Sequence, residues 1–400
     1  MSLGINLSHY LKTTLLFSLL VGFGSVISII NPLISDCITA FLAFMLLLIN
    51  KEIKVNKNLL YCVLYIYFFS TLSAILTRSN IFDYFGIYFR TAIVFIIITA
   101  FRNDYEQIKH HLIKALWILA YLAILNFILI FFIPSAFSTI VSERTGFKVE
   151  TLGFLFNYHS TINLQGFEIY RNQSIFWEPG VLQIPMNILV YFLLVEQKKK
   201  IILALLPVFI ILTTFSTTGF IILSYILVRT FLKTFTLRGN GVLKYLALFV
   251  FLILFLSFLA PLIISKFTSE EHKSSSVARQ YDMLMSVLVI KENPMIGIGI
   301  NEANYFKAIK NKNLALDDFL GSEEHGNTNT VVSVMIKFGI PLAIIFFYFI
   351  FHQNLFKNKW DFFLIMFLSL MSEPLLVVYF VILLLMSSMK LNKKTQNHYV

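Results

Sequence analysis

The sequence predicts an all-α polytopic membrane protein with about twelve transmembrane helices, or eleven in the alternative count. The first observation is composition: the 400 residues are 58% hydrophobic and 13% charged, with a mean hydropathy of +0.79. This composition excludes an ordinary soluble globular protein. The second is that apolar segments of spanning length recur along the chain, and the third is that basic residues gather in alternate loops. We therefore expect a single integral membrane domain over residues 1–400.

Each predicted span is an apolar run close to the roughly 20 residues that a helix needs to cross a bilayer. The first run follows Lys12 and is interpreted as a retained helix, because a second run follows almost at once. The last tract, residues 361–389, is interpreted as two short passes that turn at residues 372–374. The predicted spans are residues 10–30, 33–49, 58–76, 84–101, 112–133, 179–195, 200–215, 216–229, 243–264, 329–351 and the two passes of 361–389.

The basic residues of short loops predict the orientation of these spans. Such residues mark the cytoplasmic face, so the N-terminus and the C-terminal lysines are expected inside. Residues 134–178 and 265–328 then form two long external loops, expected to contain short or amphipathic helices. Sixteen of the 21 acidic residues fall on that outer side. The basic residues used are Lys51, Lys54, Lys57, Arg102, Lys109, Lys114, Lys198, Lys199, Lys200, Arg229, Lys233, Arg238, Lys244, Lys357 and Lys359.

The first external loop ends in "YRNQSIFWEPGVLQIPMNI", residues 170–188. Pro179 stands where a helix would begin, which places Glu178 at a positive helix N-terminus. A carboxylate there is favoured by about 0.3–1 kcal/mol. Two interpretations stay open for this segment. Glu178 caps the helix and pairs with Arg171 while Trp177 anchors the chain at the membrane interface, or Arg171 and Glu178 belong to a functional site.

The second external loop carries "SSSVARQYDMLMSVLVIKENPMIGIGINEANYF", residues 274–306. Val277, Tyr281, Leu284 and Leu288 recur at helical spacing, which predicts an interfacial amphipathic helix that Pro294 ends. The following "GIGIN" predicts a tight turn and is not a dinucleotide-binding fingerprint, because no strand precedes it. Taken alone, Arg279 on such a helix favours a contact with lipid headgroups.

The stretch "EEHGNTNTVVSVMIKFGIPLAIIFFYF", residues 323–349, runs from polar groups into a span. Asn327 or Asn329 can cap the helix, and His325 lies just ahead of its exposed amides. The protonation state of His325 is left open, because the helix end disfavours imidazolium whereas neighbouring glutamates favour it. Lys337 falls near the membrane centre, where a charge costs at least about 2.5–3.5 kcal/mol. Its candidate partners are Glu373, Asp83 and Glu178.

Together, the motifs of residues 168–345 resemble the O-antigen polymerase and O-antigen ligase superfamily. An Arg leads to "EPG" at the start of a span, a serine-rich run leads to Arg279 and a "GxG" turn, and "HGNTNT" leads into a helix. The resemblance implies that Arg171 and Arg279 bind the diphosphate of a polyprenyl-linked glycan, with Glu178 nearby and His325 at the acceptor. Where the family has Asn after the His, this chain has Gly326, and Asn327 is displaced by one position.

The chemistry that this resemblance implies is glycosyl transfer from an undecaprenyl diphosphate donor. A guanidinium binds phosphate oxygens through two hydrogen bonds and stays charged, so arginines suit the departing diphosphate. Glu178 and His325 are alternative bases for the acceptor proton. Tyr281, Asn327 and Asn329 are further candidate substrate-binding residues. No cofactor and no metal is expected, because the acidic pairs are adjacent in sequence rather than spaced for ligation.

Three functions are therefore considered. The first is polymerisation of O-antigen or a similar surface polysaccharide, and the second is ligation of the finished glycan to lipid A core. The third, from another class, is transport of a lipid-linked oligosaccharide, for which only Lys337 and Arg90 are candidate ionisable groups along a midplane route. The expected location is the bacterial inner membrane, with the active site facing the periplasm. Expected partners are the lipid-linked donor, membrane lipid and a chain-length regulator protein, but no nucleic acid.

Overall fold

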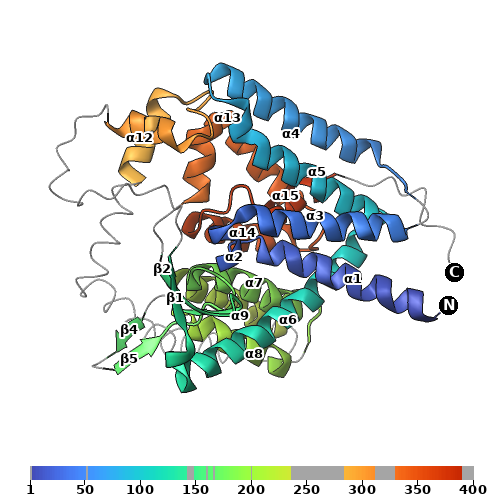
Figure 1. Ribbon diagram of the computed structural model, residues 1–400, viewed down its shortest axis with the longest axis vertical. Coiled ribbons are helices and arrows are strands. Elements are labelled where there is room, and N and C mark those ends of the chain that lie inside the picture. The colour runs from blue at the N-terminus through green and yellow to red at the C-terminus, as the bar shows by residue number, and fades with distance from the viewer. Residues whose placement is uncertain are drawn as a thin grey trace. The chain divides into compact units, whose positions relative to one another are not determined.

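The computed structural model describes residues 2–50, 53–141, 148–158, 161–164, 167–199, 201–235, 283–310 and 329–389. The chain forms two compact units, one made of residues Met1–Ala115 with Tyr281–Val400 and the other of residues Leu116–Gln280. Figure 1 labels their helices and strands. Because α6, Tyr105–Phe132, begins in the first unit and continues in the second, each unit is described by itself.

The first unit is helical throughout the residues that the structure describes. Helix α3 packs against α1 and α5, while α4 and α15 also pack against α5, and α13 packs against α14 and α15 (Figure 1). Residues 283–292 form a further helix. The elements are α1 Ser2–Val21, α2 Val26–Ile30, α3 Pro32–Ile49, α4 Lys57–Leu76, the 3₁₀ turn η1 Ile81–Tyr84, α5 Phe85–Ala100, the start of α6, α12 Glu302–Lys310, α13 Thr330–Phe351, α14 Lys359–Ser372 and α15 Tyr379–Ser387.

Six described helices are long and apolar enough to cross a membrane: Pro32–Ile49, Lys57–Leu76, Ile81–Ala100, Tyr105–Phe132, Pro179–Glu196 and Thr330–Phe351. Two shorter apolar helices, Leu7–Val21 and Ile201–Thr214, add to them. The turn predicted at residues 372–374 is confirmed, because α14 ends at Ser372 and α15 begins at Tyr379. The total of about twelve spans stays a prediction, and the predicted span 243–264 lies outside the described residues.

The first predicted span, residues 10–30, is not one continuous helix. Helix α1 begins earlier, at Ser2, and ends at Val21, and a turn through Gly24 leads into the short α2. Gly24 has a φ of 128°, a backbone conformation that residues other than glycine rarely adopt. Ser25 then accepts a hydrogen bond from the amide of Ser28 and so caps α2. The sequence prediction missed this interruption because apolar residues continue on both sides of the turn.

The second unit is built around α7, Pro179–Tyr191. Every residue of α7 is buried, and the helix packs against both α8 and α9. The remaining helical elements are the second half of α6, the 3₁₀ turn η2 Pro134–Ala136, the π-helical turn η3 Phe192–Glu196, the 3₁₀ turn η4 Ile201–Ala204, α8 Leu205–Thr213 and α9 Thr217–Phe235. A helix covered on all sides can hold polar groups away from both water and lipid.

The first predicted external loop contains strands, so the expectation of short helices is wrong for the described residues between 138 and 170. One antiparallel sheet pairs β1, Ser138–Val141, with β2, Lys148–Leu152, and β2 with β3, Phe156–Tyr158. A separate hairpin pairs β4, Thr161–Leu164, with β5, Phe167–Tyr170. Short runs of β-branched and aromatic residues alternating with polar ones favour this structure. Strand β5 ends directly before Arg171.

The helix predicted over residues 277–290 is present where the structure describes it, and it ends at residue 292, ahead of Pro294 as expected. The protein covers a face of this helix other than the predicted apolar stripe. Leu284 is 54% exposed, whereas Met285 and Val289 are 1% exposed. Val289 packs with Tyr305 of α12 and Ile336 of α13, so this neighbouring stripe of the helix is the one that the unit covers.

The turn predicted at "GIGIN" is present and lies against a break in α13. Gly339 has φ 81° and ψ 167°, which interrupts the helix, and the following Pro341 has no N–H to donate. The amides of Ile298 and Gly299 bond instead to the carbonyls of Ile336 and Lys337, at 2.8 and 3.1 Å. The amide freed at Ile340 donates to the carbonyl of Pro294 at 2.8 Å. The turn therefore supplies the backbone partners that the broken helix lacks.

Candidate functional site

The segment from Arg171 to Glu178 joins β5 to α7 in the second unit. Arg171 donates from Nε to the carbonyl of Thr214, 3.0 Å away, at the end of α8. Glu178 occupies the N-cap position of α7, and Pro179 is the first helical residue, as the sequence predicts. Both side chains are partly exposed, whereas residues 172–176 between them are no more than 1% exposed. The two charged groups thus stand at the ends of a buried connection.

Asn172 fixes the start of this connection. Its amide N–H donates to the carbonyl of Thr213 at 2.9 Å, and its side-chain Nδ2 donates to Thr213 Oγ1 and to the carbonyl of Ala123 at 3.1 and 3.0 Å. Its Oδ1 accepts a hydrogen bond from Asn126 of α6 at 3.1 Å. Asn172 and Asn126 are both fully buried. A buried side chain with these bonds has one conformation, so Arg171 beside it follows a fixed backbone.

Ser174 is the strained point of the connection. Its φ is 52°, in the left-handed region that residues other than glycine seldom adopt. The conformation is held by Asn157, which donates from Nδ2 to the Ser174 carbonyl at 2.9 Å, and by Asn172, whose Oδ1 accepts from the Ser174 amide at 3.3 Å. Strain held by a dense network is common at functional sites. The strained and hydrogen-bonded backbone at Ser174 therefore supports a precise placement of Arg171 and Glu178.

Arg171 and Glu178 do not form an ion pair with each other, so that part of the capping interpretation is wrong. The Glu178 carboxylate also makes no capping hydrogen bond to the amides of α7. Nor does it bond to any other residue that the structure describes. The arrangement offers a fixed guanidinium and an uncommitted carboxylate.

Asn329 is the N-cap of α13 in the first unit. Its Oδ1 accepts from the amides of Val331 and Val332 at 2.9 and 3.3 Å, which confirms that an asparagine caps this helix. The substrate-binding role proposed for Asn329 stays a prediction. The other candidate site residues, Arg279, Tyr281, His325 and Asn327, lie outside the described residues.

Buried amide side chains on α7 and in the segment before it form a feature that the sequence prediction missed. Asn187 donates from Nδ2 to Gln183 Oε1 at 2.7 Å and to the carbonyl of Gly219 at 3.3 Å, and both amide side chains are fully buried. Gln173 is also fully buried, and neither end of its amide has a hydrogen-bond partner among the described residues. The available signal was "QIPMN", in which two amides stand four residues apart in an apolar run.

Lys337 forms no ion pair within 4 Å with a carboxylate that the structure describes. The carboxylate whose charge acts on it is Glu302, at the first position of α12. Of the three candidates, Asp83 instead accepts a hydrogen bond from Asn301 at 2.9 Å. Glu302 is near enough to act on Lys337 because it follows the turn that docks on the break in α13, a contact that the hydrophobic pattern does not show.

The apolar helices, together with polar groups collected where helices and strands begin and end, define a multi-pass membrane protein. Residues 202–347 match the model of the O-antigen ligase family, which confirms the resemblance to the O-antigen polymerase and ligase superfamily. The match supports glycosyl transfer of the ligase or polymerase type and fits both equally. No curated protein and no solved structure matches the chain.

The matched residues include α8, α9 and α12 and most of α13, and therefore contain Thr214 and Asn329. They begin after Arg171 and Glu178. Roles for these two residues consequently depend on the sequence motif and on the geometry of their segment, rather than on the family match.

Proposed function

We propose that this protein polymerises lipid-linked oligosaccharide repeat units into O-antigen or a similar surface polysaccharide. The donor is a glycan linked to undecaprenyl diphosphate, and the reaction takes place on the outer face of the bacterial inner membrane. The observation that carries the proposal is the presence, at the two ends of one buried segment, of Arg171, which bonds to a backbone carbonyl, and of Glu178, whose carboxylate makes no hydrogen bond to the described residues. The O-antigen ligase family match of residues 202–347 supports the same chemistry.

In this reaction a hydroxyl oxygen of the acceptor sugar attacks the anomeric carbon of the donor. A new C–O bond forms, and the bond from the anomeric carbon to the phosphate oxygen breaks, with its electron pair leaving on the lipid diphosphate. Negative charge therefore grows on the diphosphate in the transition state. The guanidinium of Arg171 is oriented in advance by the Thr214 carbonyl, so it can stabilise that charge without first reorganising.

The acceptor hydroxyl must lose its proton as the new bond forms. Glu178 suits this role because its carboxylate is partly exposed and makes no hydrogen bond to the described residues. General base catalysis of this kind contributes about 10²–10⁴-fold in rate. His325 is the alternative base, and Arg279 is the second arginine proposed to bind the diphosphate.

Ligation of the finished glycan to lipid A core is the second candidate function. It is retained because the matching family model, described as O-antigen ligase, fits it as well as it fits the polymerase. The donor chemistry is the same in both reactions, because each breaks the bond between a sugar and a lipid diphosphate. The two functions differ in the acceptor.

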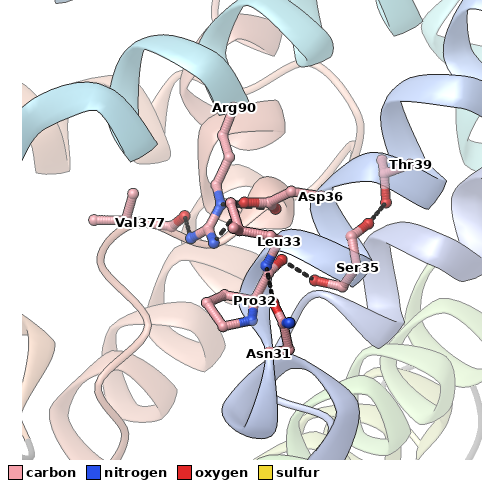
Figure 2. Close-up of polar contacts among 8 residues, drawn as sticks. All are labelled: Asn31, Pro32, Leu33, Ser35, Asp36, Thr39, Arg90 and Val377. Atoms are coloured by element: carbon pink, nitrogen blue, oxygen red, sulfur yellow. Dashed lines mark hydrogen bonds and ion pairs between the residues drawn. The ribbon is translucent and has the colours of Figure 1, made fainter. Parts of the chain in front are cut away.

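The transport hypothesis finds less support in the ionisable groups considered for it. Arg90 on α5 donates to both oxygens of Asp36 on α3 and, through Nη1, to the carbonyl of Val377 at 2.9 Å (Figure 2). Its Cζ lies 5.6 Å from the ring centre of Tyr379. Because three parts of the chain hold the guanidinium, Arg90 is better explained as a structural residue than as a group along a transport route.

The test is to delete the gene and to separate the surface polysaccharide by gel according to chain length. Under the proposal, lipid A core carries a single repeat unit in the deletion strain, and wild type restores the ladder. The deletion strain is also complemented with Glu178→Gln or with His325→Ala, each at normal protein level. The variant that fails to restore the ladder identifies the base. Glu150→Gln on β2 serves as a control and should restore the ladder.

Long chains that accumulate on the polyprenyl carrier in the deletion strain would instead identify the ligase. An unaltered ladder in that strain would contradict both glycosyl transfer functions. Export can be separated from both by measuring whether lipid-linked repeat units still reach the outer face.

A further inference from the structure

Helices α1 and α6 bring two polar pairs together at one end of the first unit. Lys114 Nζ lies 2.6 Å from His9 Nε2, and Thr13 Oγ1 lies 2.8 Å from His111 Nδ1. The rings of His9 and His111 have centroids 4.6 Å apart. Because an ammonium is a donor only, His9 accepts this hydrogen bond as a neutral imidazole.

Positive charge gathers around these pairs. The rings of His9 and His110 have centroids 6.5 Å apart, and Lys12 Nζ lies 5.8 Å from the ring centre of Phe101, the residue before Arg102 in the turn between α5 and α6. Lys12 and Lys114 therefore act electrostatically on His9, and Arg102 acts on Lys12. We call His9, Lys12, Arg102, His110 and Lys114 the basic cluster.

Little negative charge opposes the basic cluster. Asp104 is the acidic residue whose charge acts on Lys12, and Glu106 is engaged by Lys109 at 2.8 Å. Among the described residues, no carboxylate lies within ion-pair distance of Lys12, Arg102 or Lys114. Repulsion between these cations destabilises the folded unit unless anions bind nearby.

The cluster lies where an apolar stretch begins. The eighteen residues of α6 that follow Lys114, up to Phe132, contain no charged side chain and would extend about 27 Å as a helix. That length is close to the thickness of the hydrocarbon core. Lys114 would then lie at the level of the lipid headgroups.

A metal site does not explain the three imidazoles. Within the part of the chain that the structure describes, no group of three or more His, Cys, Asp and Glu side chains is arranged to hold a metal ion. His9 and His111 are instead occupied by Lys114 and Thr13. The excess of donors over acceptors indicates an anion as the ligand.

We propose that the basic cluster binds the phosphate of an anionic phospholipid headgroup. Lys12 and Arg102 supply charge from two different elements, and Lys114 is held in position by His9. Clusters of basic groups between transmembrane helices are suited to such headgroups. Inorganic phosphate shares the chemistry, and the experiment below separates the two sources.

The test measures the binding of phosphatidylglycerol and phosphatidylcholine to the full-length protein in detergent by native mass spectrometry. The double variant Lys12→Gln/Lys114→Gln should bind phosphatidylglycerol roughly 30-fold more weakly, since each basic residue near an anionic surface contributes about 1 kcal/mol. Phosphatidylcholine binding should not change. Lys307→Gln, an exposed lysine of α12, is the matched control and should bind phosphatidylglycerol like wild type.

A second variant, Lys12→Arg/Lys114→Arg, keeps the charge and should retain binding, which separates loss of the site from loss of folding. Phosphatidylglycerol binding by the glutamine variant at the wild-type level would overturn the proposal. Displacement of the bound lipid by millimolar inorganic phosphate would also overturn it, because the site would then be a site for the free anion.

Discussion

The backbone N–H of Ile298 lies 2.8 Å from the carbonyl oxygen of Ile336 and replaces a hydrogen bond that α13 loses at its break. Three glycines permit this contact. A Cβ on Gly297 would overlap the Ile336 carbonyl, one on Gly339 would overlap the Met295 carbonyl, and one on Gly299 would overlap the hydroxyl of Ser79. The "GIGIN" segment thus packs directly against the "KFGIP" segment. Gly297 and Gly339 are required there because the two backbones approach too closely for a Cβ.

Gly339→Ala should lower the free energy of unfolding by at least about 3 kcal/mol, because its φ of 81° and ψ of 167° belong to a region restricted to glycine and its Cβ meets backbone. The measurement is the thermal unfolding midpoint of the purified protein in detergent. Gly86→Ala on α5 is the control, since nothing lies within 4 Å of an added Cβ there. It should leave stability unchanged or raise it by about 0.4–1 kcal/mol. Equal midpoints for both variants would show that the backbone contact is not formed.

The Arg90–Asp36 pair gives a second prediction (Figure 2). Asp36→Asn should destabilise the first unit by about 3–5 kcal/mol, because a largely buried guanidinium loses its counter-charge. The double variant Arg90→Met/Asp36→Leu should be less destabilised than Asp36→Asn, since it removes both charges. Unfolding midpoints measure both effects. If the stability lost by the double variant equals the sum of the losses in Arg90→Met and in Asp36→Leu, the two residues are not coupled.

Much of the helical architecture could be predicted from the sequence, because helices that face lipid and helices buried in the protein both appear as apolar runs. The start of α13 could also be predicted, since Asn329 caps it locally. The strands of residues 138–170 could not, because their pairing depends on contacts between short segments. The burial of Met285 and Val289 could not be predicted either, since several stripes of that helix are apolar.

The site was predictable to the extent that its chemistry is local. Arg171, Glu178 and Pro179 are close in sequence, and their order indicated a charged segment at a helix start. The partner of Arg171 was not predictable, because the Thr214 carbonyl comes from a loop 43 residues away. Backbone carbonyls carry no sequence signature, and for that reason Glu178 was the partner that one of the two open interpretations gave to Arg171.

Arg171→Lys should lower glycosyl transfer by about 100-fold or more, because lysine cannot hold the Thr214 carbonyl and at the same time present a planar pair of donors to phosphate. The measurement is the polysaccharide ladder at equal protein level, followed by turnover of a purified lipid-linked donor. Arg78→Lys is the control, since Arg78 is not part of the proposed site. Activity of Arg171→Lys near that of the control would leave Arg171 with a structural role alone.

The predicted orientation can be tested by introducing single cysteines into a variant without Cys37 and Cys62. Cys37 is exposed and would otherwise react. Cysteine at position 150, on β2, should react with an impermeant reagent added outside the inner membrane, because the positive-inside pattern places residues 134–178 there. Cysteine at position 198, an exposed lysine after α7, should react only when the inner face is opened. The reverse pattern would place Arg171 and Glu178 on the cytoplasmic side, where a periplasmic polymerase or ligase could not use them.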